Sequence, residues 1–301
     1  RINPGSDGFS RHVLGTGGGL RSNMLNFPAP LSTGIFTPDG RRLVAFQDGA
    51  MRVFDSRDGT AQATLAKCRD AGWPVYSHDS SLVSILGMNK ETAGVWDLAT
   101  GQLLHRDIIH PSPLVMMAFS PIDDRIVTSG MENNLRLWDA RTGEELHVLQ
   151  GKAGNVMSCR FSDDGRLVLV GYAGGTARVW DAQTGDLVTT LAGGHSQRLR
   201  DVRLNPDKTR VLTWAMDDKA IIWDLAKPKA HALVEMEGDS KLLQARWISG
   251  GRDVVLAWSD GHLEVARGAT REGIRRLPEG VVPSNQDIQE WRRWHTNSSR
   301  E

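Results

Sequence analysis

Three residues able to support hydrolytic chemistry occur close together in the second half of the sequence. His195, Thr213 and Asp217 could supply the base, the hydroxyl nucleophile and the orienting acid of an acyl-transfer site. Such a site also requires a nucleophile on a sharp strand-to-helix turn and donors that hold an oxyanion. The segment around Thr213 carries neither feature, so we expect no catalytic residues in this chain.

The spacing of the other candidate ligands argues against a metal or cofactor site. The sequence has nine histidines and two cysteines, but no CxxC pair, no HExxH motif and no EF-hand pattern. The glycine-rich segment Gly15–Gly19 lacks the Gly-Lys-Ser/Thr ending of a phosphate-binding loop. We therefore expect neither a metal nor a cofactor.

The amino-acid composition argues against several further classes of protein. The 301 residues include 36 Lys and Arg and 36 Asp and Glu, so the formal net charge is zero. This balance argues against nucleic-acid or anionic-membrane binding driven by bulk charge. No apolar run of about 18 residues, as a membrane-spanning helix needs, is present. Two cysteines cannot make a disulfide framework, which fits a reducing compartment, and we expect a cytoplasmic location.

An internal repeat of about 42 residues runs through most of the chain. Its first marker is an aromatic residue followed by aspartate, and the steps between successive copies are 42, 42, 42 and 43 residues. A further 43 residues lead to Ala266, where the aromatic is lost. A second series of six residues runs in phase with the first, each closing an apolar stretch before a turn. The first series is Phe54, Trp96, Trp138, Trp180 and Trp223, and the second is Phe36, Tyr76, Phe119, Phe161, Leu204 and Trp247.

Each repeat divides into four short apolar segments separated by turns rich in Asp, Gly and Pro. In the fourth copy the predicted strands are 156–161, 167–171, 176–180 and 187–192. No segment of more than about ten residues shows a helical apolar period until the C-terminal end. There, Ser284 and Asp287 favour a helix start, and we expect a short amphipathic helix over 285–295. It either packs on the last repeat or docks a partner.

Repeated Trp-Asp pairs at this period, with four strands in each copy, resemble the WD-repeat family over about residues 27–277. The resemblance implies an all-β fold, a β-propeller of four-stranded antiparallel blades. We expect an extra outer strand in 1–15, a loop over 16–26, six repeats over 27–279 and a tail over 280–301. The outer strand in 1–15 lacks the other strands of its blade, and the first residue is Arg1 rather than Met. We therefore expect seven blades in a longer protein, and the alternative is a closed ring of six that leaves this strand unexplained.

In this family, a histidine, a hydroxyl, an acid and the tryptophan of one blade form a structural relay of hydrogen bonds. The matching positions in the fifth repeat are His195, Thr213, Asp217 and Trp223, and in the third repeat they are His110, Thr128, Glu132 and Trp138. Because such groups are largely buried between strands, each must find a hydrogen-bond partner. The resemblance therefore implies a structural role for these residues rather than a catalytic one.

The resemblance also implies a binding face, because partners of this family often dock on the rim around the central channel. The candidate binding residues at matching positions are Trp73, Met116, Met131, Arg198, Asp201, Met216 and Lys241. Aromatic, methionine and arginine side chains are typical of interface cores. The alternative is that they are partly buried between strands, since a shift of about one residue in register reverses the face.

We accordingly expect a non-catalytic scaffold or sensor that binds other proteins or other domains of its own longer chain. The regular spacing and Asp-Gly turns resemble bacterial WD-repeat regions of larger multidomain signalling proteins. One alternative is recognition of a peptide or small ligand in the central channel. Another is an enzyme that uses the propeller face, although the candidate positions hold few acids and no histidine.

Overall fold

The computed structural model describes residues 10–14, 23–27, 34–47, 49–67, 74–86, 92–109, 112–132, 134–150, 154–226, 235–236, 240–269 and 274–276. These residues form β-strands joined by turns, together with two 3-10 helices of three residues each, η1 (Ser249–Gly251) and η2 (Arg267–Ala269). Within the described ranges, no helix has the length and apolar character needed to cross a membrane. The expected all-β class is confirmed.

The described residues fall into two compact units, and the first comprises those within Arg1–His110 and Ala140–Gly143. It holds a two-stranded sheet, β1-β2, and two four-stranded antiparallel sheets, β3-β4-β5-β6 and β7-β8-β9-β10. Its strands are β1 (Ser10–Leu14), β2 (Asn23–Phe27), β3 (Gly34–Phe36), β4 (Arg42–Gln47), β5 (Ala50–Asp55), β6 (Ala61–Lys67), β7 (Val75–Tyr76), β8 (Leu82–Leu86), β9 (Thr92–Asp97) and β10 (Leu103–Ile109).

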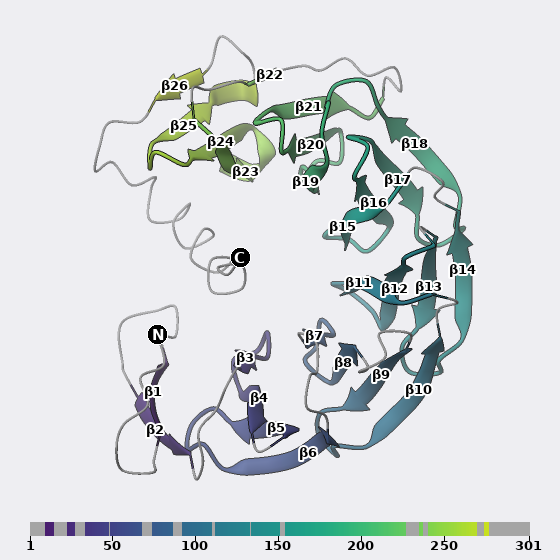
Figure 1. Cartoon of the computed structure of the whole chain (residues 1–301), viewed down its shortest axis with the longest axis vertical. Helices are drawn as coiled ribbons and strands as arrows, with labels where there is room; N and C mark the ends of the chain where they lie inside the picture. The colour runs from purple at the N-terminus through teal and green to yellow at the C-terminus, as the bar shows by residue number, and fades with distance from the viewer. Residues whose placement is uncertain are drawn as a thin grey trace. The chain divides into compact units, whose positions relative to one another are not determined.

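The second unit comprises the described residues within Pro111–Asp139 and Glu144–Asp287. It holds four more four-stranded sheets, in each of which consecutive strands pair in chain order (Figure 1). Its strands are β11 (Leu114–Phe119), β12 (Arg125–Gly130), β13 (Leu135–Asp139), β14 (Glu145–Leu149), β15 (Val156–Phe161), β16 (Leu167–Tyr172), β17 (Ala177–Asp181), β18 (Leu187–Leu191), β19 (Leu199–Leu204), β20 (Arg210–Ala215), β21 (Ala220–Asp224), β22 (Glu235–Met236), β23 (Leu242–Ile248), β24 (Asp253–Trp258), β25 (Leu263–Ala266) and β26 (Ile274–Arg276).

Each repeat in the sequence corresponds to one four-stranded sheet. In the fourth repeat the strands begin and end within one residue of their predicted bounds. The loop expected over 16–26 is wrong at its C-terminal end, because residues 23–27 form β2 and pair with β1. The polar residues Asn23 and Asn26 interrupt the apolar alternation that would predict a strand in this segment. The helix expected over 285–295 lies outside the described residues.

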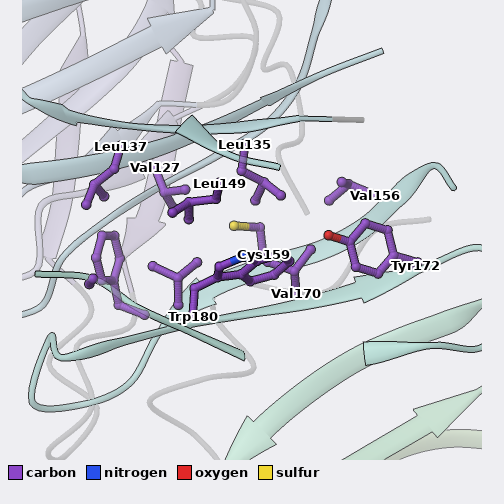
Figure 2. Close-up of a cluster of buried hydrophobic side chains, with 12 residues drawn as sticks. Val127, Leu135, Leu137, Leu149, Val156, Cys159, Val170, Tyr172 and Trp180 are labelled. Atoms are coloured by element: carbon purple, nitrogen blue, oxygen red, sulfur yellow. The ribbon is translucent and has the colours of Figure 1, made fainter. Parts of the chain in front are cut away.

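The core of the second unit lies between neighbouring sheets. In β12, β16 and β20, five of six residues are buried, so the usual alternation of buried and exposed residues is lost. This pattern indicates strands that are covered on both faces. Figure 2 shows how Val127, Leu135 and Leu137 face Val170 and Trp180 of the next sheet. Burying each such side chain stabilises the fold by about 1.5–3 kcal/mol.

The sixth repeat keeps a filled core although its marker aromatic is lost. Ala266 is fully buried, and Trp258 of β24, which is 1 % exposed, belongs to the same apolar cluster as Ala266 and Trp214. The indole N–H of Trp258 donates to the Glu264 carboxylate at 3.1 Å. A large aromatic side chain from the neighbouring strand therefore fills this cluster.

The turns use aspartate to hold backbone donors. In the Asp-x-x-Thr-Gly turn after β9, Asp97 Oδ1 accepts hydrogen bonds from the N–H groups of Ala99 and Thr100, at 2.9 and 2.8 Å. The turn closes at Gly101, whose φ of 70° lies in the left-handed region that favours glycine. The same Asp and Gly positions recur after β17. The repeated turn chemistry thus fixes where the outer strands β10 and β18 begin.

Arg125, at the start of β12, ties the third repeat to the fourth. Its two terminal nitrogens donate to the carbonyls of Ala182 and Gly165, each at 2.8 Å, and it pairs with Asp123 at 2.7 Å. Because both carbonyls belong to turns of the next sheet, one guanidinium fixes the spacing of two sheets at their edge.

Replacing Arg125 should therefore weaken the contact between these two sheets. We expect Arg125→Met to lower the free energy of unfolding by about 2–3 kcal/mol, because two hydrogen bonds from a charged donor are lost. Chemical denaturation followed by tryptophan fluorescence measures this change. Arg166→Met is the matched control, since the Arg166 side chain is 81 % exposed. Equal losses in both variants would contradict the role of Arg125.

In the turn between β15 and β16, the carboxylate of Asp164 accepts hydrogen bonds from three donors. Burial favours a higher pKa for this carboxyl, but hydrogen bonds from Lys208, Ser162 and the Arg166 N–H outweigh it and lower the pKa to about 2. The Lys208 ammonium lies 2.5 Å from Asp164 Oδ2, and the Ser162 hydroxyl lies 2.6 Å from Oδ1. The ionised carboxylate is therefore the form that the folded state favours.

A lowered pKa in the folded state makes the contribution of Asp164 depend on acid pH. The carboxylate stabilises the fold fully above the ordinary aspartate pKa of about 3.9, and this stabilisation is lost as pH falls toward about 2. We expect the stability gap between the wild type and Asp164→Asn to shrink over that window in acid titrations. Asp163→Asn, exposed in the same turn, controls for net charge. A difference in stability between the wild type and Asp164→Asn that stays constant down to pH 2 would contradict the lowered pKa of Asp164.

Candidate functional site

The residues of the expected relay in the fifth repeat lie in a continuous chain of hydrogen bonds. The Trp223 indole N–H donates to Thr213 Oγ1 at 2.7 Å, and Thr213 Oγ1 lies 2.8 Å from His195 Nε2. His195 Nδ1 lies 3.1 Å from an oxygen of Asp217. If Nδ1–H donates to Asp217, then Nε2 accepts from the Thr213 hydroxyl, and each polar group has a partner.

The sheet register explains how these side chains meet. Thr213 on β20 pairs with Ile221 on β21, so Trp223 occupies the diagonal position on the same face. Gly194 allows the chain ahead of His195 to pass over this face, because a Cβ there would come within 2.6 Å of Ile221 and 2.9 Å of Trp223. The arrangement is thus a property of local pairing together with one close backbone approach.

This chain of hydrogen bonds has no route to a substrate. Thr213 is fully buried, and the side chains of His195 and Asp217 are 0 % and 4 % exposed. The Thr213 hydroxyl oxygen also accepts a hydrogen bond from the Trp223 indole N–H. The geometry supports a structural role, in which the side chains join β20 and β21 to the segment ahead of β19.

The third repeat shows only part of the same pattern. The Trp138 indole N–H donates to Thr128 Oγ1 at 2.8 Å, as its counterpart does in the fifth repeat. The backbone N–H of Glu132 donates to the Ser112 hydroxyl at 3.0 Å. His110 lies outside the described residues. The tryptophan–threonine bond is therefore the element that these two repeats share.

The candidate binding residues are brought together by a backbone hydrogen bond that recurs in all four sheets of the second unit. In each sheet, the N–H of the residue after the second strand donates to the carbonyl of a residue just before the first strand. We call these the rim pairs. They are Met131 with Pro113 at 3.0 Å, Ala173 with Asn155 at 2.8 Å, Met216 with Arg198 at 3.0 Å, and Ser259 with Lys241 at 2.9 Å.

The rim pairs are largely open to solvent. Met131 is 65 % exposed, and Arg198 and Lys241 are also exposed. Met216 is half-buried, with its sulfur against the Arg198 guanidinium. An exposed methionine and two exposed cations at equivalent sheet edges give a surface suited to contacts with another macromolecule.

Two candidates do not belong to this exposed set. Asp201 is 7 % exposed and is paired with Arg160 and Arg203, so it is unavailable to a partner at the rim. Met116 is half-buried against the core cluster between the third and fourth sheets. Trp73 lies outside the described residues. The alternative of partial burial thus applies to Asp201 and Met116.

A β-bulge explains why the register failed at that position. In all four sheets the pairing of the first strand with the second skips one residue near the start of the first strand, as between Leu114 and Met116. An extra residue at a bulge is unpaired and changes which face the next side chain takes. The skipped residues, here called the bulge residues, are Val115, Met157, Arg200 and Leu243.

The bulge residues are the part of the surface that sequence reasoning missed. Val115 is 50 % exposed and Leu243 is 52 % exposed, and both are large apolar side chains that directly follow a buried leucine, Leu114 or Leu242. The only signal in the sequence is a pair of adjacent apolar residues at the start of the strand. The rim pairs and the bulge residues together are called the rim face below.

The relay makes a direct prediction about stability. We expect Thr213→Val to lower the free energy of unfolding by about 2 kcal/mol or more, because the buried Trp223 and His195 nitrogens lose the hydroxyl. Thr213→Ser keeps the hydroxyl and should lose less, although it removes a buried methyl group. Urea denaturation of the three proteins measures the difference. If valine and serine cost the same, the hydroxyl has no structural role.

Comparison with known families agrees with this geometry. The family model described as "WD domain, G-beta repeat" matches residues 101–139 and 143–181. Each matched segment begins at the glycine of an Asp-x-x-Thr-Gly turn and ends at a Trp-Asp pair, so it spans the outer strand of one sheet and three strands of the next. No curated protein matches the chain. The four-stranded antiparallel sheets are consistent with a β-propeller of WD repeats, and two of the repeats match the WD-repeat model.

Proposed function

We propose that this chain is a non-catalytic platform that binds another protein through the rim face. WD40 repeats generally mediate protein–protein interactions. The observation that carries the proposal is the recurring backbone hydrogen bond, which brings a residue pair to the same edge of four consecutive sheets. A surface built from equivalent positions of several rigid sheets is preorganised, so a partner that binds it spends little free energy on ordering it.

The composition of the rim face favours a partner with apolar and acidic side chains. Apolar residues gather at the third repeat, in Val115 and Met131, and cations at the fifth and sixth, in Arg198, Arg200 and Lys241. None of the twelve residues of the rim face carries a carboxylate. Apolar contacts supply most of the binding free energy in such interfaces, whereas complementary charge sets the orientation and the association rate.

We further propose that the platform forms one part of a larger multidomain protein and acts in the cytoplasm. The regular repeat spacing and the Asp-Gly turns support the first point by their likeness to bacterial WD-repeat regions. For the second, Cys159 is a free and buried thiol, and burial raises its pKa to about 12. An inert thiol of this kind is compatible with a reducing compartment.

Comparative capture from a lysate of the source cells tests the rim face. We expect Met131→Ser/Arg198→Ser to lose proteins that the wild type retains, because the double variant removes one apolar and one cationic contact from different sheets. The matched control is Leu187→Ser/Arg166→Ser, which changes the same residue classes at exposed positions away from the rim. Quantitative mass spectrometry compares the three baits after circular dichroism has verified their folds.

The possible outcomes distinguish the rim face from the rest of the protein surface as the place where a partner binds. Proteins retained by the wild type and the control but lost by the rim variant support the proposal. Loss in the control alone, or equal capture by all three baits, would place the interface away from the rim face.

A further inference from the structure

Methionine is concentrated on the rim face. Three of its twelve residues, Met131, Met157 and Met216, are methionines, whereas the whole chain of 301 residues has nine. Met131 directly follows β12 and Met216 directly follows β20, at equivalent edges of their sheets (Figure 1). The thioether is the side-chain group of this face that mild oxidants attack most readily. The composition therefore makes oxidation a chemical modification to consider for this surface.

The methionines of the described residues differ in how far solvent reaches them. Met131 is 65 % exposed, the highest fraction among the exposed large apolar side chains in this part of the chain. Met157 and Met216 are half-buried, and Met51 of the first unit is 3 % exposed within an apolar cluster. An oxidant must reach the sulfur, so the rate of oxidation follows exposure. Met131 is therefore the side chain most open to this reaction.

Arg198 treats the second rim methionine differently. Its guanidinium Nε donates a hydrogen bond to the Met216 sulfur. A thioether sulfur is a weak acceptor, and a lone pair held by a cationic donor is less available to attack an electrophilic oxygen. The contact thus slows oxidation of Met216 beyond what its partial burial does, and it makes Met131 the preferred site of the two.

We propose that Met131 is a reversible oxidation site whose co-reactant is a hydroperoxide. The sulfur lone pair attacks one peroxide oxygen, and an S–O bond forms as the O–O bond breaks. The sulfur loses two electrons and the peroxide gains them. The other oxygen takes up the proton and leaves as water or as an alcohol. The product is methionine sulfoxide, a polar and chiral side chain that methionine sulfoxide reductases convert back to methionine.

Oxidation of Met131 regulates the rim face, and this consequence rests on the proposed function. Met131 and Val115, which are 65 % and 50 % exposed, supply the apolar contacts of the third repeat. A sulfoxide oxygen is a strong hydrogen-bond acceptor, and burying it against apolar groups of a partner without a donor costs free energy. Hydroperoxide therefore weakens partner binding, and enzymatic reduction of the sulfoxide restores it.

Peptide mass spectrometry of the folded chain, after timed exposure to hydrogen peroxide, tests the modification without any partner. We expect Met131 to gain one oxygen several-fold faster than Met216, and Met51 to react slowest. In Arg198→Ser, Met216 should react several-fold faster while Met131 keeps its rate. Arg166→Ser, at an exposed position away from the rim, is the matched control and should change neither rate. Oxidation of Met131 no faster than that of Met51, or an unchanged Met216 rate in Arg198→Ser, would overturn the proposal.

Capture from the lysate, with each bait compared before and after peroxide, tests the consequence for binding. Oxidised wild type should lose proteins that the reduced form retains, and treatment with methionine sulfoxide reductases should restore them. Peroxide should reduce capture by Met131→Leu by a much smaller fraction, since leucine is similar in volume and has no sulfur. Equal capture by oxidised and reduced wild type, when Met131→Ser/Arg198→Ser loses the proteins, would overturn this regulation and leave the platform standing. Full capture by that double variant would instead contradict the platform, and the peroxide rates would still decide whether Met131 is the oxidation site.

Discussion

Each four-stranded sheet of this protein is stable only if both of its faces are covered. The second strands, β12, β16 and β20, are buried at five of six positions, which one sheet alone cannot achieve. A repeat is therefore a unit of sequence but not a unit of stability. The same requirement accounts for Arg125, which ties the third repeat to turns of the fourth, and for Trp258, which fills the cluster around Ala266.

Because both faces of a sheet are covered, some polar side chains are buried between neighbouring sheets. Their hydrogen-bond arrangements differ from one pair of sheets to the next. In the fifth repeat, Thr213 joins Trp223 to His195, so its buried hydroxyl has a hydrogen-bond partner in each of them. Between the fourth and fifth sheets, Asp201 accepts hydrogen bonds from both Arg160 and Arg203. The first arrangement joins uncharged donors and acceptors with one carboxylate, whereas the second pairs a buried carboxylate with two guanidinium groups.

Sequence periodicity predicted the fold well and the surface less well. The 42-residue steps place one sheet per repeat, because turn chemistry and apolar segments recur locally and need no knowledge of distant contacts. The rim pairs Arg198–Met216 and Lys241–Ser259 follow from the same register. The exposure of Asp201 and Val115 does not follow from this register, because a bulge near the start of each first strand of the second unit breaks the two-residue alternation, and no residue type marks it. The pairing of Asp201 with Arg160 could not be predicted, because it depends on how two neighbouring sheets pack.

The recurring rim hydrogen bond is the feature on which the placement of the interaction face depends. Residue-resolved amide hydrogen exchange of the folded chain measures it directly. The N–H groups of Met131, Ala173, Met216 and Ser259 follow the second strands, where turn amides ordinarily exchange fast. We expect all four to exchange slowly, because each donates to a carbonyl ahead of the first strand. Fast exchange at these four amides, with slow exchange in β12, β16, β20 and β24, would contradict the common edge and the face built on it.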